Sequence, residues 1–273
     1  MVHFIVSATF NFHRGGDGRR QGAMGTLRVS LFVTCLVDAF FPSVGQSTVE
    51  LLERLGVQVD FPMQQTCCGQ PAFNSGFADE ARAVAATLLD AFADSEYVVA
   101  PSGSCVAMIR HYFPQLFAGT PRAAEAESLA QRTYELCEFI TERLQITDVG
   151  ATFPARVTYH ASCHATRGLG IKEPPLRLLE AVRGLELVDL PYAEDCCGFG
   201  GTFAVKFADL SAAMGAKKAG HVESTGADVL TGLDMSCLMH LRGLMERRGR
   251  GPRVMHVAEI LNSRGGAASG RAS

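Results

Sequence analysis

The chain has 273 residues and a formal net charge of -3, from 25 Lys and Arg against 28 Asp and Glu. This balance, without a run of basic residues interleaved with aromatics, argues against a nucleic-acid partner. The longest apolar run contains an aspartate and is too short to cross a bilayer, and no secretory signal pattern is visible. We therefore expect a cytoplasmic protein without an integral membrane segment, whose nine cysteines bind metal or carry out redox chemistry.

Both ends of the chain lack useful hydrophobic periodicity. Residues 1–25 are rich in Gly and Arg, and residues 263–273 are equally biased, so we expect a disordered N-terminal extension and a disordered tail. The first convincing strand begins just after Met24, which makes this methionine a candidate for the true start.

Between these ends, strand-like runs lead into cysteines and helical patterns follow them. In residues 26–150 such runs end at Cys35, at the adjacent pair Cys67 and Cys68, and at Cys105. A helix-rich stretch then closes the segment. The order is therefore one cysteine, a pair followed by glycine, and one more cysteine.

Residues 151–262 repeat this order with Cys163, the pair Cys196 and Cys197, and Cys237. The gaps between the single cysteines and the pair are 31 and 36 residues in the first segment and 32 and 39 in the second. A repeated order over such long spans predicts two copies of one cysteine-rich structural unit.

Alternating strands and helices predict an α/β protein of two pseudo-repeated units, each a small parallel sheet flanked by helices with cysteines at the carboxyl ends of the strands. Ligands of such sheets bind beyond those ends, so the three cysteine loops of each unit are expected to converge on one site. Cys137 instead lies at helical spacing among Leu136, Phe139 and Ile140, and we interpret it as a buried hydrophobic residue.

Four thiolates that converge on one crevice suit a soft metal centre, because thiolate sulfur favours zinc, copper(I) and iron-sulfur clusters. Ordinary core cysteines would have no reason to recur as adjacent pairs at matching places. Zinc is the alternative cofactor, although its usual Cys-x-x-Cys pairs are missing. Adjacent ligands suit an iron-sulfur cluster better, since neighbouring thiolates can reach different irons and the following glycine lets the backbone approach closely.

Several motifs carry a family resemblance: "FVTCLVDAF", "CCGQPAFNSG", "PSGSC", "CCGFGGTFAVK" and "MHVAEIL". They resemble the CCG domain of the heterodisulfide reductase B subunit and of the iron-sulfur subunits of glycolate oxidase and anaerobic glycerol-3-phosphate dehydrogenase. The pattern is similar in particular to that of the lactate utilization protein A family. The resemblance runs from about Arg28 to about Asn262.

The resemblance implies an iron-sulfur oxidoreductase that acts as an electron-transfer subunit, with two other lactate-utilization proteins, in oxidising L-lactate to pyruvate. The chain alone is then expected to be inactive toward lactate. The implied cofactor is one or two 4Fe-4S clusters per chain. The ligands carried over by position are Cys35, Cys67, Cys68, Cys105, Cys163, Cys196, Cys197 and Cys237.

The fullest form of the family motif ends in Cys-x-x-Cys, whereas Ser102 and Asp234 occupy the first of those positions here. This departure favours an ordinary 4Fe-4S cluster, or a variant with Asp234 as an oxygen ligand, over the five-cysteine noncubane cluster of heterodisulfide reductase. The other interpretation of Asp234 is a cap at the start of the helix that carries Cys237.

His160 and His164 flank Cys163, and a role beside the metal for one of them competes with an ordinary loop histidine; His240 is a weaker candidate of the same kind. No nucleotide, flavin or Ser-His-Asp motif is visible, so no catalytic residue is assigned. Two further functions stay open: a heterodisulfide-reductase-like thiol/disulfide redox enzyme, and a zinc-stabilised interaction module.

Overall fold

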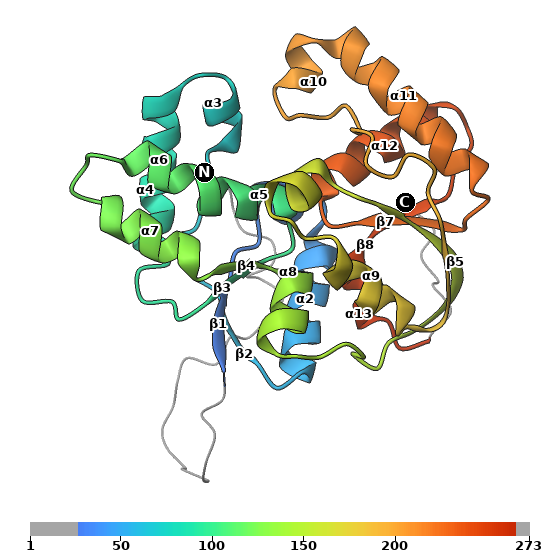
Figure 1. Cartoon of the computed structure of the whole chain (residues 1–273), viewed down its shortest axis with the longest axis horizontal. Coiled ribbons are helices and arrows are strands. Elements are labelled where there is room, and N and C mark those ends of the chain that lie inside the picture. The colour runs from blue at the N-terminus through green and yellow to red at the C-terminus, as the bar shows by residue number, and fades with distance from the viewer. Residues whose placement is uncertain (1–26, 266–273) are drawn as a thin grey trace.

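The computed structural model describes residues 27–265 and contains two parallel four-stranded sheets (Figure 1). The expected N-terminal extension and most of the expected tail lie outside the described residues. We call residues 27–150 the first unit and residues 151–265 the second unit. Each unit contains one sheet with helices packed around it, as the alternation of strand and helix patterns predicts.

The first sheet consists of β1 (Arg28–Leu31), β2 (Gln58–Asp60), β3 (Val98–Ala100) and β4 (Thr133–Glu135). Its spatial order is β2-β1-β3-β4, and every neighbouring pair is parallel. The central strand β3 is buried along its whole length, as strands of a parallel sheet covered on both faces must be.

The second sheet consists of β5 (Thr152–His160), β6 (Arg183–Val188), β7 (Val229–Gly232) and β8 (Arg253–His256). Its order, β6-β5-β7-β8, is the order of the first sheet, again with parallel neighbours throughout. The prediction of an α/β fold built from two pseudo-repeated units with parallel sheets is confirmed.

Short helices follow most strands, and some of them include π-helical turns, labelled η. Those of the first unit are α1 (Cys35–Phe40), α2 (Pro42–Arg54), α3 (Gln70–Asn74), α4 (Ala78–Ala91), α5 (Gly103–Ala107), η2 (Met108–Tyr112), α6 (Phe113–Phe117), α7 (Ala123–Gln131), α8 (Leu136–Glu138) and η3 (Phe139–Arg143). Those of the second unit are η4 (His164–Gly168), α9 (Glu173–Glu180), α10 (Phe203–Lys206), α11 (Ala208–Ser224), α12 (Met235–Arg247) and α13 (Val257–Asn262).

The two units match in local detail as well as in strand order. Strand β4 ends at Glu135, which forms a reciprocal capping box with Glu138 at the start of α8. Strand β8 ends at His256, which forms the same box with Glu259 at the start of α13. The last strand of each unit therefore turns into a helix through the same device.

The units contact each other through several pairs of helices. Helix α13 packs on α2, where the Arg54 guanidinium donates to the Asn262 side chain over 2.6 Å and to the Leu261 carbonyl over 2.7 Å. Helix α5 packs on η4 so closely that a Cβ at Gly103 would lie 2.8 Å from the Cβ of Ala165. Only glycine fits at that contact.

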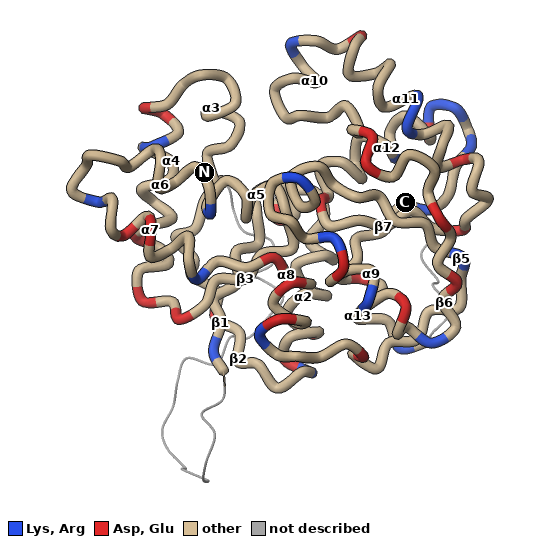
Figure 2. Tube along the Cα trace, viewed as in Figure 1, with Lys and Arg blue, Asp and Glu red and all other residues tan. Residues whose placement is uncertain are grey.

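Charged residues of both signs are interspersed along the trace of both units, without a continuous basic stripe (Figure 2). In residues 27–265, no helix combines the length and the apolar character that crossing a bilayer requires.

Candidate metal centre

The eight repeated cysteines line one cavity of about 340 Å³, to which both units contribute. They are Cys35, Cys67, Cys68, Cys105, Cys163, Cys196, Cys197 and Cys237. We expected the cysteine loops to converge within each unit; the structure also brings the two sets to one shared cavity. Helices α3 and α10, which follow the two cysteine pairs, lie at the same end of the molecule (Figure 1).

In the first unit the four cysteines come from loops beyond three neighbouring strands. Cys35 begins α1 after β1, the pair follows β2, and Cys105 lies in α5 after β3. The sulfur of Cys35 is 3.7 Å from that of Cys67, and the sulfur of Cys68 is 3.6 Å from that of Cys105. The carboxyl ends of parallel strands thus gather four thiols in two pairs whose sulfurs are in contact.

The thiols of the first set differ in pKa. Contact with Cys35, and then with Cys68, lowers the pKa of Cys67 to about 3, and the Gly69 amide acts in the same direction. The same contact with Cys67, together with burial, raises the pKa of Cys35 well above its usual value. One thiolate is therefore supported by neighbouring protonated thiols. Only a bound cation would allow all four to ionise together.

The second unit repeats this arrangement. Contact with Cys163, and then with Cys197, lowers the pKa of Cys196 to about 2, whereas contact with Cys196 raises that of Cys197. Contact with Cys197 lowers the pKa of Cys237 to about 6, and the His160 imidazole acts in the same direction. The thiol with the lowest pKa is the first member of the pair in both units.

The glycine after each pair has two roles. Its amide donates to the sulfur of the first cysteine over 3.4 Å, from Gly69 to Cys67 and from Gly198 to Cys196. Its backbone is left-handed, with φ of +81° at Gly69 and +87° at Gly198. A Cβ at Gly198 would stand 2.5 Å from the Ser211 carbonyl oxygen, so only glycine allows this close turn under α11.

His160 lies beside two thiols of the second set. Its imidazole is buried, and within residues 27–265 neither ring nitrogen has a well-formed hydrogen bond. One ring nitrogen and the sulfurs of Cys197 and Cys237 lie within 4.8 Å of one another. The Nδ1 atom of His164 is 3.7 Å from the Cys163 sulfur. Both flanking histidines thus approach thiols, and His160 does so from inside the protein.

Asp234 does not cap its own helix, so that interpretation is wrong. Its carboxylate is buried and faces the first unit instead. Oδ1 accepts hydrogen bonds of 2.9 Å from the Ser102 hydroxyl and from the backbone amide of Ser104, and Oδ2 accepts one from the Ser162 hydroxyl. The aspartate therefore accepts a first-turn amide of helix α5 in the other unit, next to Ser102, which is the N-cap residue of that helix.

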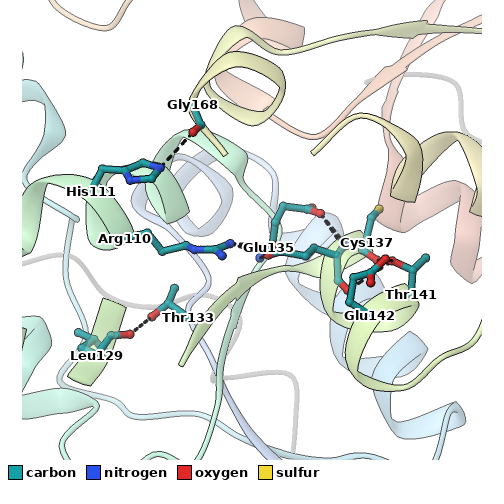
Figure 3. A network of polar contacts seen from close by, with 10 residues as sticks. Arg110, His111, Leu129, Thr133, Glu135, Cys137, Thr141, Glu142 and Gly168 are labelled. Atoms are coloured by element: carbon teal, nitrogen blue, oxygen red, sulfur yellow. Dashed lines mark hydrogen bonds and ion pairs between the residues drawn. The ribbon is translucent and has the colours of Figure 1, made fainter. Parts of the chain in front are cut away.

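Cys137 is fully buried and packs with Leu136, Phe139 and Ile140, away from the cavity-lining residues. Its amide donates to the Glu135 carboxylate over 2.7 Å within the polar network of Figure 3. Burial raises the pKa of its thiol. This placement agrees with its interpretation as a small hydrophobic residue.

The donor set fits a soft metal centre. It offers eight thiols in two sets of four, low-pKa thiols in both sets, and backbone amides directed at sulfur. Hard oxygen-binding cations are a poor match for such ligands, whereas iron-sulfur clusters and zinc are a good one.

Sequence reasoning did not identify Lys218, which is fully buried in α11 behind the second cysteine pair. Its ammonium donates to the carbonyls of Tyr192 and Ala193 over 2.8 and 2.7 Å, and burial lowers its pKa to about 8. The available signal was a lysine at helical spacing among small and apolar residues such as Gly215, Ala219 and Val222.

The sequence matches the family described as a cysteine-rich domain, CCG, over residues 29–110 and again over residues 157–242. A lactate utilization protein A of Geobacillus kaustophilus is 56% identical over 239 residues, covering 87% of this chain and 100% of that protein. The protein of the same name in Bacillus subtilis is 53% identical over the same shares. Among solved structures, a glutamate racemase isoform of Bacillus anthracis shares 9% identity and a TM-score of 0.35, covering 87% of this chain and 79% of that one, which is too low to support an argument.

Proposed function

The chain belongs to the lactate utilization protein A family of CCG cysteine-rich domain proteins, and from that premise we propose that it is an iron-sulfur electron-transfer subunit of a complex that oxidises L-lactate to pyruvate. The relatives' name supports a role in lactate utilization. The observation that carries the proposal is the gathering of all eight repeated cysteines around one cavity.

Each unit would hold its own cluster through the four cysteines of its set. The first set is Cys35, Cys67, Cys68 and Cys105, and the second is Cys163, Cys196, Cys197 and Cys237. A bound cluster supplies reversible one-electron uptake and release.

The protein's own residues favour that role in two ways. The amides of Gly69 and Gly198 donate to thiolate sulfur, which stabilises the negative charge of the ligands. Apolar side chains such as Leu36, Val37 and Phe199 line the cavity and limit the access of water.

The cavity supports electron relay rather than lactate binding at this site. An α-hydroxy acid carries a carboxylate, for which proteins commonly supply an arginine or a lysine. Among the described residues that line the cavity there is neither. We therefore place lactate on another protein of the complex, and expect two further lactate-utilization proteins as partners.

Metal analysis of anaerobically purified protein tests the proposal. We expect a brown protein with about four iron atoms and four acid-labile sulfides per occupied site, and an EPR signal after reduction with dithionite. Lactate oxidation should require the partner proteins. A colourless protein with stoichiometric zinc would overturn the proposal in favour of a zinc-stabilised module.

The shared cavity also favours a second candidate, a thiol/disulfide redox enzyme, because two metal sites facing one space could act on one disulfide. Reduction of a small disulfide by the isolated, dithionite-reduced protein distinguishes this candidate. A rate no higher than that of the metal-free protein would exclude it.

A further inference from the structure

The surroundings of the two cysteine sets can be compared position by position, because the two units share their local geometry. Gly69 approaches the carbonyl of Ala81 in α4, and Gly198 approaches the carbonyl of Ser211 in α11. Ala81 is the fourth residue of α4, and Ser211 is the fourth residue of α11. The two helices therefore pack on the two cysteine pairs in the same register.

In this register Leu88 of α4 corresponds to Lys218 of α11, the eleventh residue of each helix. Both side chains are fully buried. Leu88 belongs to the same apolar cluster as Cys68. The Lys218 ammonium instead donates hydrogen bonds to the carbonyls of Tyr192 and Ala193. Asp195 and then Cys197, Cys237 and Cys196 raise its pKa against the larger effect of burial, so its charge is felt at the second set of thiols.

A second exchange occurs at the carboxyl end of the first strand of each unit, where Phe32 follows β1 and His160 ends β5. Phe32 lies three residues before Cys35, and His160 lies three residues before Cys163. Both are buried, and Phe32 packs in the cluster that contains Cys68. His160 brings a ring nitrogen toward the sulfurs of Cys197 and Cys237, which a phenyl ring cannot do.

A third exchange lies on the helices that carry the last cysteine of each set. Met108 follows Cys105 by three residues, and His240 follows Cys237 by three residues. Met108 is buried in the apolar cluster of the first unit. The His240 imidazole is partly buried against Phe199, with its ring centroid 6.1 Å from that of the phenyl group.

In all three exchanges the second unit has a basic side chain where the first unit has an apolar one. Around the first set the corresponding positions are apolar, and around the second set they carry one ammonium and two imidazoles. A positive charge and N–H donors near a metal-thiolate centre stabilise its reduced form, because reduction adds negative charge.

From these exchanges we propose that the two metal sites are functionally unequal, with the second-unit site having the higher reduction potential and receiving the first electron that enters the chain. The inference rests on the proposed iron-sulfur function. Asp234 lies between the units, where it accepts hydrogen bonds from Ser102 of the first unit and Ser162 of the second. Its negative charge also acts on Cys237, against the positive charge of Lys218.

The test is an EPR-monitored redox titration of the full, anaerobically purified chain with its iron, using dithionite as the one-electron donor. The variants Cys67→Ser and Cys196→Ser assign signals to the two sites. In the unchanged protein, the EPR signal of the second-unit site should appear at a higher potential than that of the first-unit site. Lys218→Met should lower the reduction potential of the second-unit site by at least about 59 mV, which corresponds to a tenfold change in the equilibrium constant of a one-electron reduction. Leu88→Met is the matched control and should leave the reduction potentials of both sites unchanged.

Iron and sulfide content and the melting temperature are measured on every variant. If Lys218→Met does not fold, His240→Met replaces it and should shift the same signal in the same direction. Equal potentials, earlier reduction of the first-unit site, or an equal shift in Leu88→Met would each overturn the proposal. A chain with zinc and no iron overturns the proposed function itself, and metal analysis separates that outcome from the others.

Discussion

The Ser102 hydroxyl donates a 2.9 Å hydrogen bond to the Asp234 carboxylate, and these two residues hold the same position in the two units, three residues before Cys105 and Cys237. Equivalent residues therefore meet between the units. Two carboxylates at this buried contact would repel each other, whereas a hydroxyl and a carboxylate form a hydrogen bond. The difference between Ser102 and Asp234 thus has a structural reason.

Asp234→Asn should weaken the contact between the units and leave the iron in place. An amide oxygen can replace only part of what the carboxylate accepts from Ser102, Ser104 and Ser162, so we expect a loss of about 1–3 kcal/mol in the free energy of unfolding. Denaturant unfolding and iron analysis measure the two effects. The exposed Asp209→Asn is the control. Loss of iron with unchanged stability would instead identify Asp234 as a ligand.

Replacing Cys196 or Cys197 by serine should lower the iron content and abolish lactate-dependent activity of the assembled complex, because a hydroxyl is a poor ligand for soft metals. Cys137→Ser should keep its iron, since this residue does not line the cavity, and should cost about 1–3 kcal/mol for burying a hydroxyl. The assignment of ligands fails if the Cys137 variant loses the metal and the pair variants retain it.

Gly198→Ala should destabilise the second-unit site. The φ of +87° is costly for alanine by about 1 kcal/mol, and the new Cβ would stand 2.5 Å from the Ser211 carbonyl. Iron content and thermal unfolding should both fall. The control is Gly220→Ala in α11, where a Cβ meets nothing within 4 Å and alanine should stabilise the helix by about 0.5–1 kcal/mol. Equal effects of the two changes would contradict this account.

Glu135 should make stability fall as pH rises. Burial raises the pKa of its carboxyl from 4.5 to about 8, so between these values the unfolded chain is ionised while the folded chain keeps the proton. Stability from this group is therefore lost as pH rises from about 4.5 to about 8. Glu135→Gln keeps an acceptor for the amides of Cys137 and Glu138 and removes the titration.

Unfolding free energies at several pH values check this prediction. The Glu135→Gln variant should gain stability relative to the unchanged protein as pH rises, by on the order of 4 kcal/mol across the window. The control Glu142→Gln, at an exposed position, should show the same pH dependence of the unfolding free energy as the unchanged protein. A constant difference between Glu135→Gln and the unchanged protein at all pH values would show that the carboxyl is not held protonated.

The repeated units, the parallel sheets and the cysteines beyond the strands follow from sequence pattern, because spacing and alternation are local properties. The sequence did not reveal β4 and β8 as strands. Strand β4 has three residues, Thr133–Glu135, inside a stretch of helical composition, which is too few for a period of two to be visible. Pairing with β3 determines its conformation.

The shared cavity and the cross-unit role of Asp234 were also beyond the sequence. Both depend on how the units pack, which is determined by contacts such as Arg54 with Asn262 that lie 208 positions apart. The ligand identities remain a prediction from position and resemblance, now supported by the proximity of the thiols.

The internal repeat gives the protein a freedom that a symmetric dimer lacks. In a homodimer of one such unit, a buried lysine at the position of Lys218 would necessarily face both cysteine sets, and an aspartate at the position of Asp234 would meet its own copy. Because both units lie on one chain, each side can accept a substitution that the other does not carry. Duplication followed by divergence can thus give the two cysteine sets different surroundings within a single folded molecule.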